Sequence, residues 1–318
     1  MRRAGSRRGR RRVRMSSADE HLRVTEIWRY PVKSLGGERL TSAQVHRDGL
    51  AGDHRWAIVD ESNGTVASAK RTRVWGALLQ CSARLDPGAD PADPAALRIT
   101  TPDGAESAGD DPATLARLSE LCGRPLRLQY SSAVPPGGMT MEMEWAPETH
   151  EGMEKAIEYS SARAAQDAGS SVPVGAVPTG GGRGRYYDLA PVHIVTTSSV
   201  RRLIDDDTPI RAAVRRFRPN IVVGGDDWDD GYVEDTWLGG PIEAGALGLT
   251  PTIPVGRCVM VTLQHGTVER DRTALRRIAA RHRRDVGYGT APAPALGIYA
   301  DVHRPATVEV GDAVRVGG

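Results

Sequence analysis

The sequence contains few cysteines and no long apolar run. Its three cysteines, Cys81, Cys122 and Cys258, are too few and too widely spaced for a disulfide framework or a paired CxxC zinc site. The CxxxxCxxC spacing that binds a [2Fe–2S] cluster is also missing, so the chain carries no ferredoxin module of its own. No apolar stretch approaches the roughly 18 residues of a membrane span. We therefore expect a cytoplasmic protein that does not bind a membrane.

Phenylalanine and lysine are scarce as well. The 318 residues include one Phe and three lysines, Lys33, Lys70 and Lys155, so arginine supplies nearly all the positive charge. An arginine bias of this kind indicates a GC-rich coding sequence rather than a function. A single arginine is therefore weak evidence for a site here, and a lysine is stronger evidence.

The net charge of +2 is set by the first residues of the chain. Residues 1–14 hold eight arginines and no acid, and without those arginines the net charge falls from +2 to −6. A nucleic-acid site would rest on this segment alone, and we expect no nucleic-acid partner. The segment is too polar for a signal peptide. We expect residues 1–20 to be a disordered tail, with Met15 as an alternative start.

The hydropathy pattern divides the rest of the chain into two β-rich parts. In residues 21–130, alternating residues predict a strand over 22–34 that enters a loop at a proline, and "SNG" predicts a hairpin turn after "WAIVD". Asp111 and Gly123 bound a predicted helix as N-cap and C-terminal stop. The Gly- and Pro-rich residues 131–185 predict a mobile inter-domain segment with a helix near 150–166.

The second part covers residues 186–318. A predicted strand here ends in a cluster over 196–199 that is well placed to cap a helix. "RFRPNIVVGG" predicts a loop and a buried strand, and apolar spacing predicts a helix over 272–285. "VEVGDAVRV" predicts a hairpin. The fold class expected is α+β and mostly β, with peripheral helices.

Cys258 is the first candidate for chemistry. It follows Arg257 and opens the apolar, β-branched run "VMVT", which is typical of a strand. A neighbouring positive charge stabilises a thiolate, the form that attacks electrophiles and binds metals. A buried structural cysteine is the alternative.

Several cationic residues lie at predicted strand ends. Lys33 and Ser34 follow Pro31, where a loop can offer an ammonium, a hydroxyl and N–H groups to an anion. Arg218 and Asn220 flank a proline just before a buried strand, a position that suits either ligand binding or loop bracing. Arg55 faces away from Trp56 in a predicted strand, so one of the two should be buried, with a pair to Asp53 as the structural alternative.

Other site types find little support. The acidic residues of "GGDDWDDGYVEDTW" fail the EF-hand spacing and predict a solvated acidic turn. The histidines form no HExxH pair. The sequence has no GxSxG elbow, no P-loop and no GxGxxG after a strand.

Read together, these segments resemble one family. "RYPVKS…GLAGDHRW" is similar to the N-terminal β-barrel domain that precedes a molybdenum cofactor sulfurase C-terminal (MOSC) domain. "RFRPNIVVGG…EDTW…GRCVMVT…LGIYADV…VEVGDAV" is similar to the MOSC domain, a β-barrel. The resemblance covers most of 22–316 and omits the arginine tail and 131–185. It is nearest to the amidoxime-reducing component branch.

This resemblance implies a molybdopterin-type molybdenum cofactor and reduction of a small N-hydroxylated substrate. Cys258 would be the catalytic residue and the protein ligand to the metal. Electrons would come from a separate donor protein of the ferredoxin, cytochrome or flavin reductase type, since no such module is present. The residues expected to bind the pterin and its phosphate are Lys33, Ser34, Arg55, Thr196, Thr197, Arg218, Asn220 and Arg257.

The sequence also departs from the family. Members often carry a second cysteine two residues before the "RC", where this chain has Val255 and Gly256. A different function therefore stays open at this point, a sulfur carrier or transferase with a persulfide on Cys258 and no metal. A cofactor carrier without turnover is a third possibility.

Overall fold

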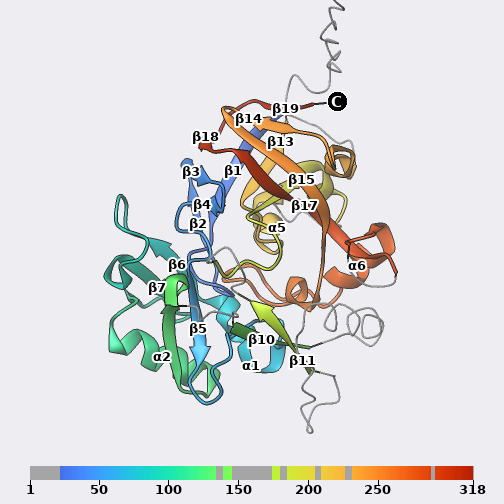
Figure 1. Ribbon diagram of the computed structural model, residues 1–318. Helices are drawn as coiled ribbons and strands as arrows, with labels where there is room; N and C mark the ends of the chain where they lie inside the picture. Colours follow the sequence, from blue (N-terminus) through green and yellow to red (C-terminus); the bar gives the residue numbers. More distant parts are fainter. Residues whose placement is uncertain are drawn as a thin grey trace, which may run out of the picture.

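A computed structural model describes residues 22–133, 139–144, 174–179, 185–204, 209–225, 231–287 and 291–317. In these residues the chain is mostly β with short helices at the periphery, as the sequence predicts (Figure 1). The expected tail over 1–20 and the helix expected near 150–166 lie outside the described residues, and so does most of 131–185.

A nine-stranded sheet is the centre of the fold. Its order is β19-β14-β15-β17-β12-β13-β1-β2, with β16 on β17, and only β12 and β13 run parallel among these neighbours. The parallel pair sets the starts of both strands side by side, which positions the site described below. The strands are β1 (Arg23–Arg29), β2 (Glu38–Leu40), β12 (Val192–Thr196), β13 (Ile221–Gly224), β14 (Ile242–Ala244), β15 (Leu247–Gly256), β16 (Arg283–Arg284), β17 (Ala293–Arg304) and β19 (Val314–Val316).

Smaller sheets complete the β structure. Their orders are β18-β3-β4, β5-β9, β6-β7-β8 and β10-β11. Their strands are β3 (Ser42–His46), β4 (Gly49–Leu50), β5 (Trp56–Asp60), β6 (Ser82–Leu85), β7 (Leu97–Thr100), β8 (Glu106–Ala108), β9 (Leu126–Tyr130), β10 (Met139–Glu144), β11 (Val174–Thr179) and β18 (Ala306–Glu309).

The first strands of the chain pair with its last strands. β1 pairs with β13 and β3 with β18, so the strands before residue 50 do not form a sheet with the rest of 21–130. Ile27 faces Ile221 in this register, and both side chains are buried in one apolar core. The predicted domain boundary at residue 130 therefore does not follow the strand pairing. β1 and β13 are neighbours in one sheet, and their apolar side chains share one core.

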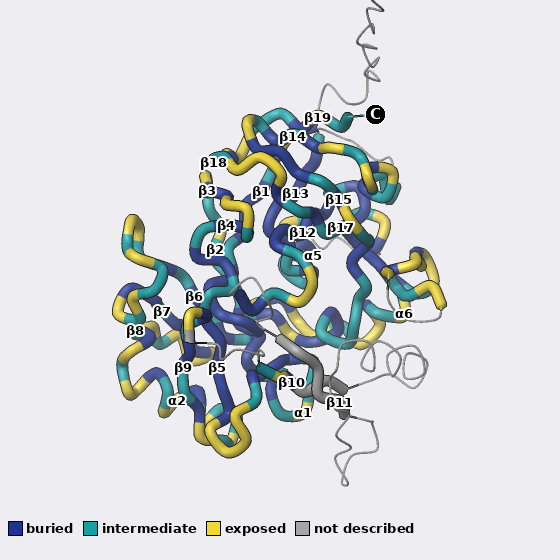
Figure 2. Tube along the Cα trace, in the orientation of Figure 1, coloured by how far each residue is buried: buried dark blue, intermediate teal, exposed yellow. Residues whose placement is uncertain are grey.

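The helices are short and lie on the outside of the sheets (Figures 1 and 2). α2 has the predicted caps, since Asp111 accepts a hydrogen bond from Ala113 N and Gly123 is left-handed with φ 66°. None of the helices in the described ranges is long and apolar enough to cross a membrane. The helices are α1 (Thr72–Trp75), α2 (Pro112–Cys122), α4 (Thr197–Arg201), α5 (Ile210–Arg215), α6 (Ala274–Arg281) and the 3₁₀ turns η2 (Gly76–Gln80), η3 (Pro94–Ala96), η4 (Ser131–Ala133), η5 (Val233–Trp237) and η6 (Val259–Thr262).

Two local predictions are wrong. The run after Cys258 is the 3₁₀ turn η6 and not a strand, because β15 ends at Gly256 and Val261 turns into the core beside α5 and α6. The predicted C-terminal hairpin does not form either, because β18 pairs with β3 while β19 pairs with β14. In both cases contacts with distant segments override the local β propensity.

Candidate functional site

The loop after β1 holds the first candidate residue, Lys33. Its backbone N–H donates to Trp56 O at 2.9 Å, which fixes the loop against β5. Its side chain is 7% exposed, and Nζ donates to Tyr186 O at 2.8 Å and to Asp188 Oδ1 at 2.7 Å. Burial lowers the pKa of Lys33, and the Asp188 carboxylate opposes that shift.

A second lysine, Lys70, shares the same carboxylate. Its Nζ lies 2.8 Å from Asp188 Oδ2, so each oxygen of Asp188 binds one ammonium group. Burial alone would raise the pKa of Asp188, but Lys33 and Lys70 hold it well below its usual range. Sequence reasoning missed Lys70 and Asp188. The scarcity of lysine was a signal for Lys70, whereas nothing local marks Asp188.

Ser34 connects this loop to the segment that follows Cys258. Its Oγ accepts a hydrogen bond from Ala69 N at 3.1 Å and lies 3.3 Å from Ala67 O, to which it donates. Ala69 packs against Leu263, in the segment just after η6. Ser34 is thus linked through Ala69 to Leu263, in the segment that follows η6, although the two lie far apart in sequence.

Arg218 contacts the same loop from a distant part of the sequence. Its guanidinium donates to Leu35 O, two residues after Lys33, and stacks over the Tyr30 ring at 4.3 Å. The Tyr30 hydroxyl is buried and has no hydrogen-bond partner in the described part of the chain. A buried orphan hydroxyl beside a cation indicates a place where a polar ligand could be bound.

Backbone strain gathers at this site. Three non-glycine residues in the described ranges have left-handed φ values, Ser34 at 67°, His54 at 48° and Arg218 at 56°. His54 N donates to Tyr30 O at 2.8 Å, next to the ring under Arg218. Left-handed residues with a Cβ cost free energy and cluster at functional sites, so this local strain supports a binding role.

His193 links Arg218 to Arg257. Its Nδ1 lies 3.1 Å from Arg218 O and its Nε2 lies 2.7 Å from an Nη of Arg257. Burial, together with the charge of Arg257, lowers the pKa of His193 well below its ordinary value, so the ring is neutral near pH 7. A neutral ring satisfies both contacts when Nδ1–H donates to the carbonyl and Nε2 accepts from the guanidinium.

Arg257 and Cys258 lie at the end of β15. The Arg257 guanidinium donates to Phe217 O at 3.1 Å and to Leu296 O at 3.0 Å through Nε, so it braces β17 and the segment after α5 as well as His193. Cys258 is half-buried and begins η6. It is thus presented by the loop after a strand rather than by the strand itself.

Asn220 and Arg55 lie beside this arrangement. The Asn220 Oδ1 accepts from His193 N at 3.0 Å and its Nδ2 lies 3.4 Å from Trp28 O, to which it donates, so it joins β12 to β1. Arg55 Nε donates to Tyr130 Oη at 2.9 Å, and an Nη lies 3.6 Å from Asp48. The sequence alternative for Arg55 is a pair with Asp53, whose carboxylate has other contacts in the structure. Asp53 Oδ1 accepts from Tyr30 N at 2.7 Å, and Oδ2 lies 2.6 Å from His54 Nδ1.

The structure places Thr196 and Thr197 at the opposite end of the parallel strands. Thr196 caps α4 by accepting from Ser199 N at 3.1 Å, as the sequence predicts, and donates to Glu234 Oε2 at 2.7 Å. It pairs with Val223 near the far end of β13, whereas Arg218 lies before the start of that strand. Thr197 packs there against Gly224. These two threonines are therefore not brought together with the other predicted site residues.

The predicted acidic turn is not solvated where it is described. Glu234 is 1% exposed, and burial raises its pKa. Asp235 Oδ2 lies 2.8 Å from His282 Nε2 and 2.5 Å from Arg284 Nε, so it ties η5 to the end of α6. Residues 226–230 of this turn lie outside the described ranges. No cluster of three or more His, Cys, Asp or Glu suited to a metal ion occurs among the residues that the structure describes.

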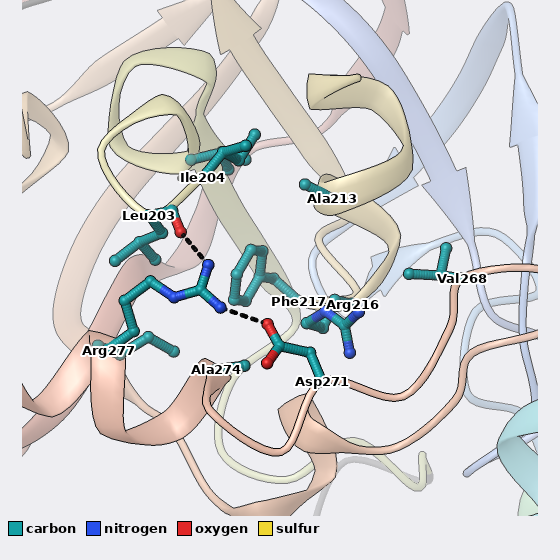
Figure 3. Close-up of a pocket in the computed structure, with 11 residues that line it drawn as sticks. Leu203, Ile204, Ala213, Arg216, Phe217, Val268, Asp271, Ala274 and Arg277 are labelled. Carbon is teal, nitrogen blue, oxygen red and sulfur yellow. Dashed lines mark hydrogen bonds and ion pairs between the residues drawn. The ribbon is translucent and has the colours of Figure 1, made fainter. Parts of the chain in front are cut away.

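A largely apolar hollow lies behind the Cys258 loop, between α4, α5 and α6 (Figure 3). It measures about 500 Å³ including its opening to solvent, and Phe217 forms part of its wall. Arg216 donates to Val261 O at 2.9 Å and to Leu263 O at 3.0 Å, which anchors η6 from this side. Arg277 joins Leu203 O to Asp271 across the hollow. The polar side chains that line the hollow thus help to hold η6 in place.

Comparison with known proteins follows this geometry. The chain matches the model of the MOSC N-terminal beta barrel domain over residues 21–114 and that of the MOSC domain over residues 182–315, so the two matches span most of it. It is similar to the crystal structure of the YuaD protein from Bacillus subtilis, with a TM-score of 0.37 and 10% identity over 92% of this chain and 93% of that chain. It is also similar to that of YiiM from Geobacillus stearothermophilus, with a TM-score of 0.27 and 12% identity over 41% of this chain and 55% of that chain. No curated protein matches the chain.

Proposed function

Because the chain belongs to the MOSC family, whose domains occur in molybdenum cofactor sulfurase and related proteins, we propose that it binds a molybdopterin-type molybdenum cofactor as an oxidoreductase. Its substrate would be a small N-hydroxylated or similar N-oxygenated compound. The overall change is R–NHOH + 2e⁻ + 2H⁺ → R–NH₂ + H₂O, with both electrons supplied by a separate donor protein. When bound, the cofactor would supply the two-electron chemistry for this oxygen removal.

The residues present fit such a cofactor. A molybdopterin carries a dianionic phosphate, and Lys33, Lys70 and Arg218 gather positive charge around the loop after β1. Charge-assisted hydrogen bonds from such groups are the strong ones in phosphate recognition. The buried Tyr30 hydroxyl without a partner adds a further donor beside Arg218. Arg55, which directly precedes β5 beside the loop that holds Lys33, is a fourth cation at the edge of this cluster.

Cys258 is the residue we assign to the metal. Its thiol is half-buried at the start of η6, whereas Cys81 is buried in an apolar core and burial raises its pKa to about 12. A thiolate is the soft ligand that suits a molybdenum centre. Arg216 holds η6 to the end of α5, and Arg257 holds the residue before Cys258 to β17, so both flanks of the Cys258 turn are anchored.

One observation carries the proposal: the loop with Lys33 and Ser34, the strained Arg218 and the Cys258 turn meet at one place. Arg218 binds Leu35 O, its own carbonyl binds His193, and His193 binds Arg257, the residue before Cys258. Anion-binding groups and a soft metal ligand thus lie in one connected arrangement. A persulfide carrier would need the thiol but not this set of cations.

Elemental and pterin analysis tests the proposal. The chain is produced in a host supplied with molybdate, and molybdenum and pterin are measured per mole of protein. We expect both in the unaltered chain and loss of molybdenum, with part of the pterin retained, in Cys258→Ala. Cys122→Ala, which removes a half-buried thiol on α2, is the matched control and keeps both.

The opposite result is also well defined. Unaltered protein without molybdenum, with one extra sulfur on Cys258 that a reductant removes, would identify the sulfur carrier instead. Full molybdenum content in Cys258→Ala would remove Cys258 from the metal site.

A further inference from the structure

Two of the three lysines in the chain converge on one aspartate, and the aspartate occupies the position of a bound anion. Lys33 Nζ and Lys70 Nζ lie 2.7 Å and 2.8 Å from the two oxygens of Asp188. We propose that Asp188 is an internal occupant of an anion site made by Lys33 and Lys70, and that a phosphate-bearing ligand binds by taking over both ammonium groups. Lys70 is thereby a binding residue of this site.

The two sides of the contact differ in how firmly they are held. The side chains of Lys33 and Lys70 are 7% and 13% exposed, whereas that of Asp188 is 33% exposed. Lys33 also donates to Tyr186 O, and Tyr186 N is itself bonded to His54 O, so the backbone beside Asp188 is anchored. Rotation of the Asp188 side chain toward solvent would therefore take the carboxylate away from both ammonium groups while Lys33 keeps its carbonyl partner.

The charge balance favours a dianion over the carboxylate. Asp188 supplies one negative charge to two lysines. The Arg218 guanidinium adds a third positive charge to this loop, because it donates to the carbonyl of Leu35, which follows Lys33 by two residues. A phosphate monoester carries up to two negative charges and three terminal oxygens, so it balances these cations better than a single carboxylate does. The ligand class is thus a phosphate monoester.

This inference rests on the proposed function only for the identity of the natural ligand, the phosphate of the cofactor. The test uses inorganic phosphate and full-length protein from a host that makes no molybdopterin. Molybdenum and pterin play no part in it. A failure of the proposed function therefore leaves the result intact, and a failure here leaves the metal analysis intact.

The experiment is calorimetric titration of phosphate into the unaltered chain and three variants in chloride buffer. We expect Asp188→Asn to bind phosphate about tenfold more tightly. Removal of the competing carboxylate should change the free energy of phosphate binding by about as much as one charge-assisted hydrogen bond. Lys70→Met should weaken binding by about the same factor. Asp86→Asn is the matched control, because Asp86 also bridges two cations, Arg84 and Arg98, in the β6-β7-β8 sheet. It should leave the phosphate affinity unchanged.

Thermal unfolding supplies a second readout. Asp188→Asn leaves two nearly buried ammonium groups without their carboxylate, so it should melt lower than the unaltered chain and gain more from added phosphate. Equal phosphate affinity in Asp188→Asn and the unaltered chain would overturn the proposal. If Asp188→Asn does not fold, Lys70→Met decides alone, and an unchanged affinity in that variant would overturn it as well.

Discussion

The Nε2 atom of His193 lies 2.7 Å from a guanidinium nitrogen of Arg257, where His193 is buried and Arg257 is half-buried. The contact requires a neutral imidazole, because a protonated Nε2 would point its hydrogen at a cation. His193 also binds the carbonyl of Arg218, the residue whose left-handed backbone carries a proposed phosphate-binding side chain. The protonation state of one histidine is therefore coupled to the geometry of two arginines.

Stability should consequently fall as the pH drops below about 6.5, the ordinary pKa of histidine. The folded-state pKa of His193 is lowered, so the unfolded chain binds the extra proton and folding loses free energy on the acid side. His265, whose pKa burial lowers to about 3, acts in the same direction. Each group contributes about 1.4 kcal/mol per pH unit below 6.5. Urea unfolding between pH 7.5 and 5 measures the slope.

The matched pair for this prediction is His193→Gln and His46→Gln. His46 is exposed on β3, so its removal should leave the slope unchanged, while His193→Gln should reduce it by about one group's share. Restricting the pH to 5 and above keeps exposed carboxylates ionised, and the buried Glu234, whose pKa is raised, contributes equally in both variants. A slope that is the same in both variants would show that His193 is not the titrating group.

Local signals account for the parts of the fold that the sequence predicts. α2 is bounded by Asp111 and Gly123 because an N-cap and a left-handed stop act over one turn of helix. The cap of α4 at Thr196 is of the same kind. By contrast, the pairing of β3 with β18 joins residues more than 250 positions apart, and no local pattern specifies it.

The site residues also differ in whether a local sequence signal marks them. Lys33 and Arg218 lie beside prolines at strand ends, which marks them in the sequence. Asp188 carries no such mark, because its role comes from two lysines 155 and 118 residues earlier in the chain. The sequence predicts that Arg257 acts on the neighbouring Cys258 thiol, but its guanidinium binds the carbonyls of Phe217 and of Leu296 in β17, partners that only the packed fold determines.

Arg218→Ala should lower cofactor occupancy about tenfold while the fold survives, because one charge-assisted hydrogen bond to the phosphate is lost. Arg211→Ala is the control, since Arg211 is an exposed residue of the nearby α5 that pairs with Glu26. Pterin content per mole of purified protein is the measurement, with circular dichroism to check folding. Full pterin content in Arg218→Ala would mean that Arg218 only packs on the Tyr30 ring and does not bind the cofactor.

Thr196→Val should destabilise the protein by about 2 kcal/mol, since it removes an N-cap and the hydroxyl bound to buried Glu234. Pterin content should stay unchanged, because Thr196 lies at the end of β12 away from Arg218. Thr197→Val, a change of the same shape one residue later, should cost less, as the Thr197 hydroxyl forms no cap. Loss of pterin in Thr196→Val without loss of stability would return this threonine to the cofactor site.

Cys258→Ala and Cys258→Ser separate the thiolate from the fold around it. Cys258 is half-buried, and its turn is held by Arg216 and Arg257, so both variants should melt within a few degrees of the unaltered chain. Reductase activity toward an N-hydroxylated amidine, with a chemical electron donor in place of the unidentified partner, should fall to background in Cys258→Ala. Cys258→Ser should retain a trace at most, because a hydroxyl is a harder and poorer ligand than a thiolate for this metal. Cys122→Ala should keep full activity, which excludes a general effect of thiol loss. Equal activity in Cys258→Ala and Cys122→Ala would contradict both the metal-ligand role and the persulfide role of Cys258.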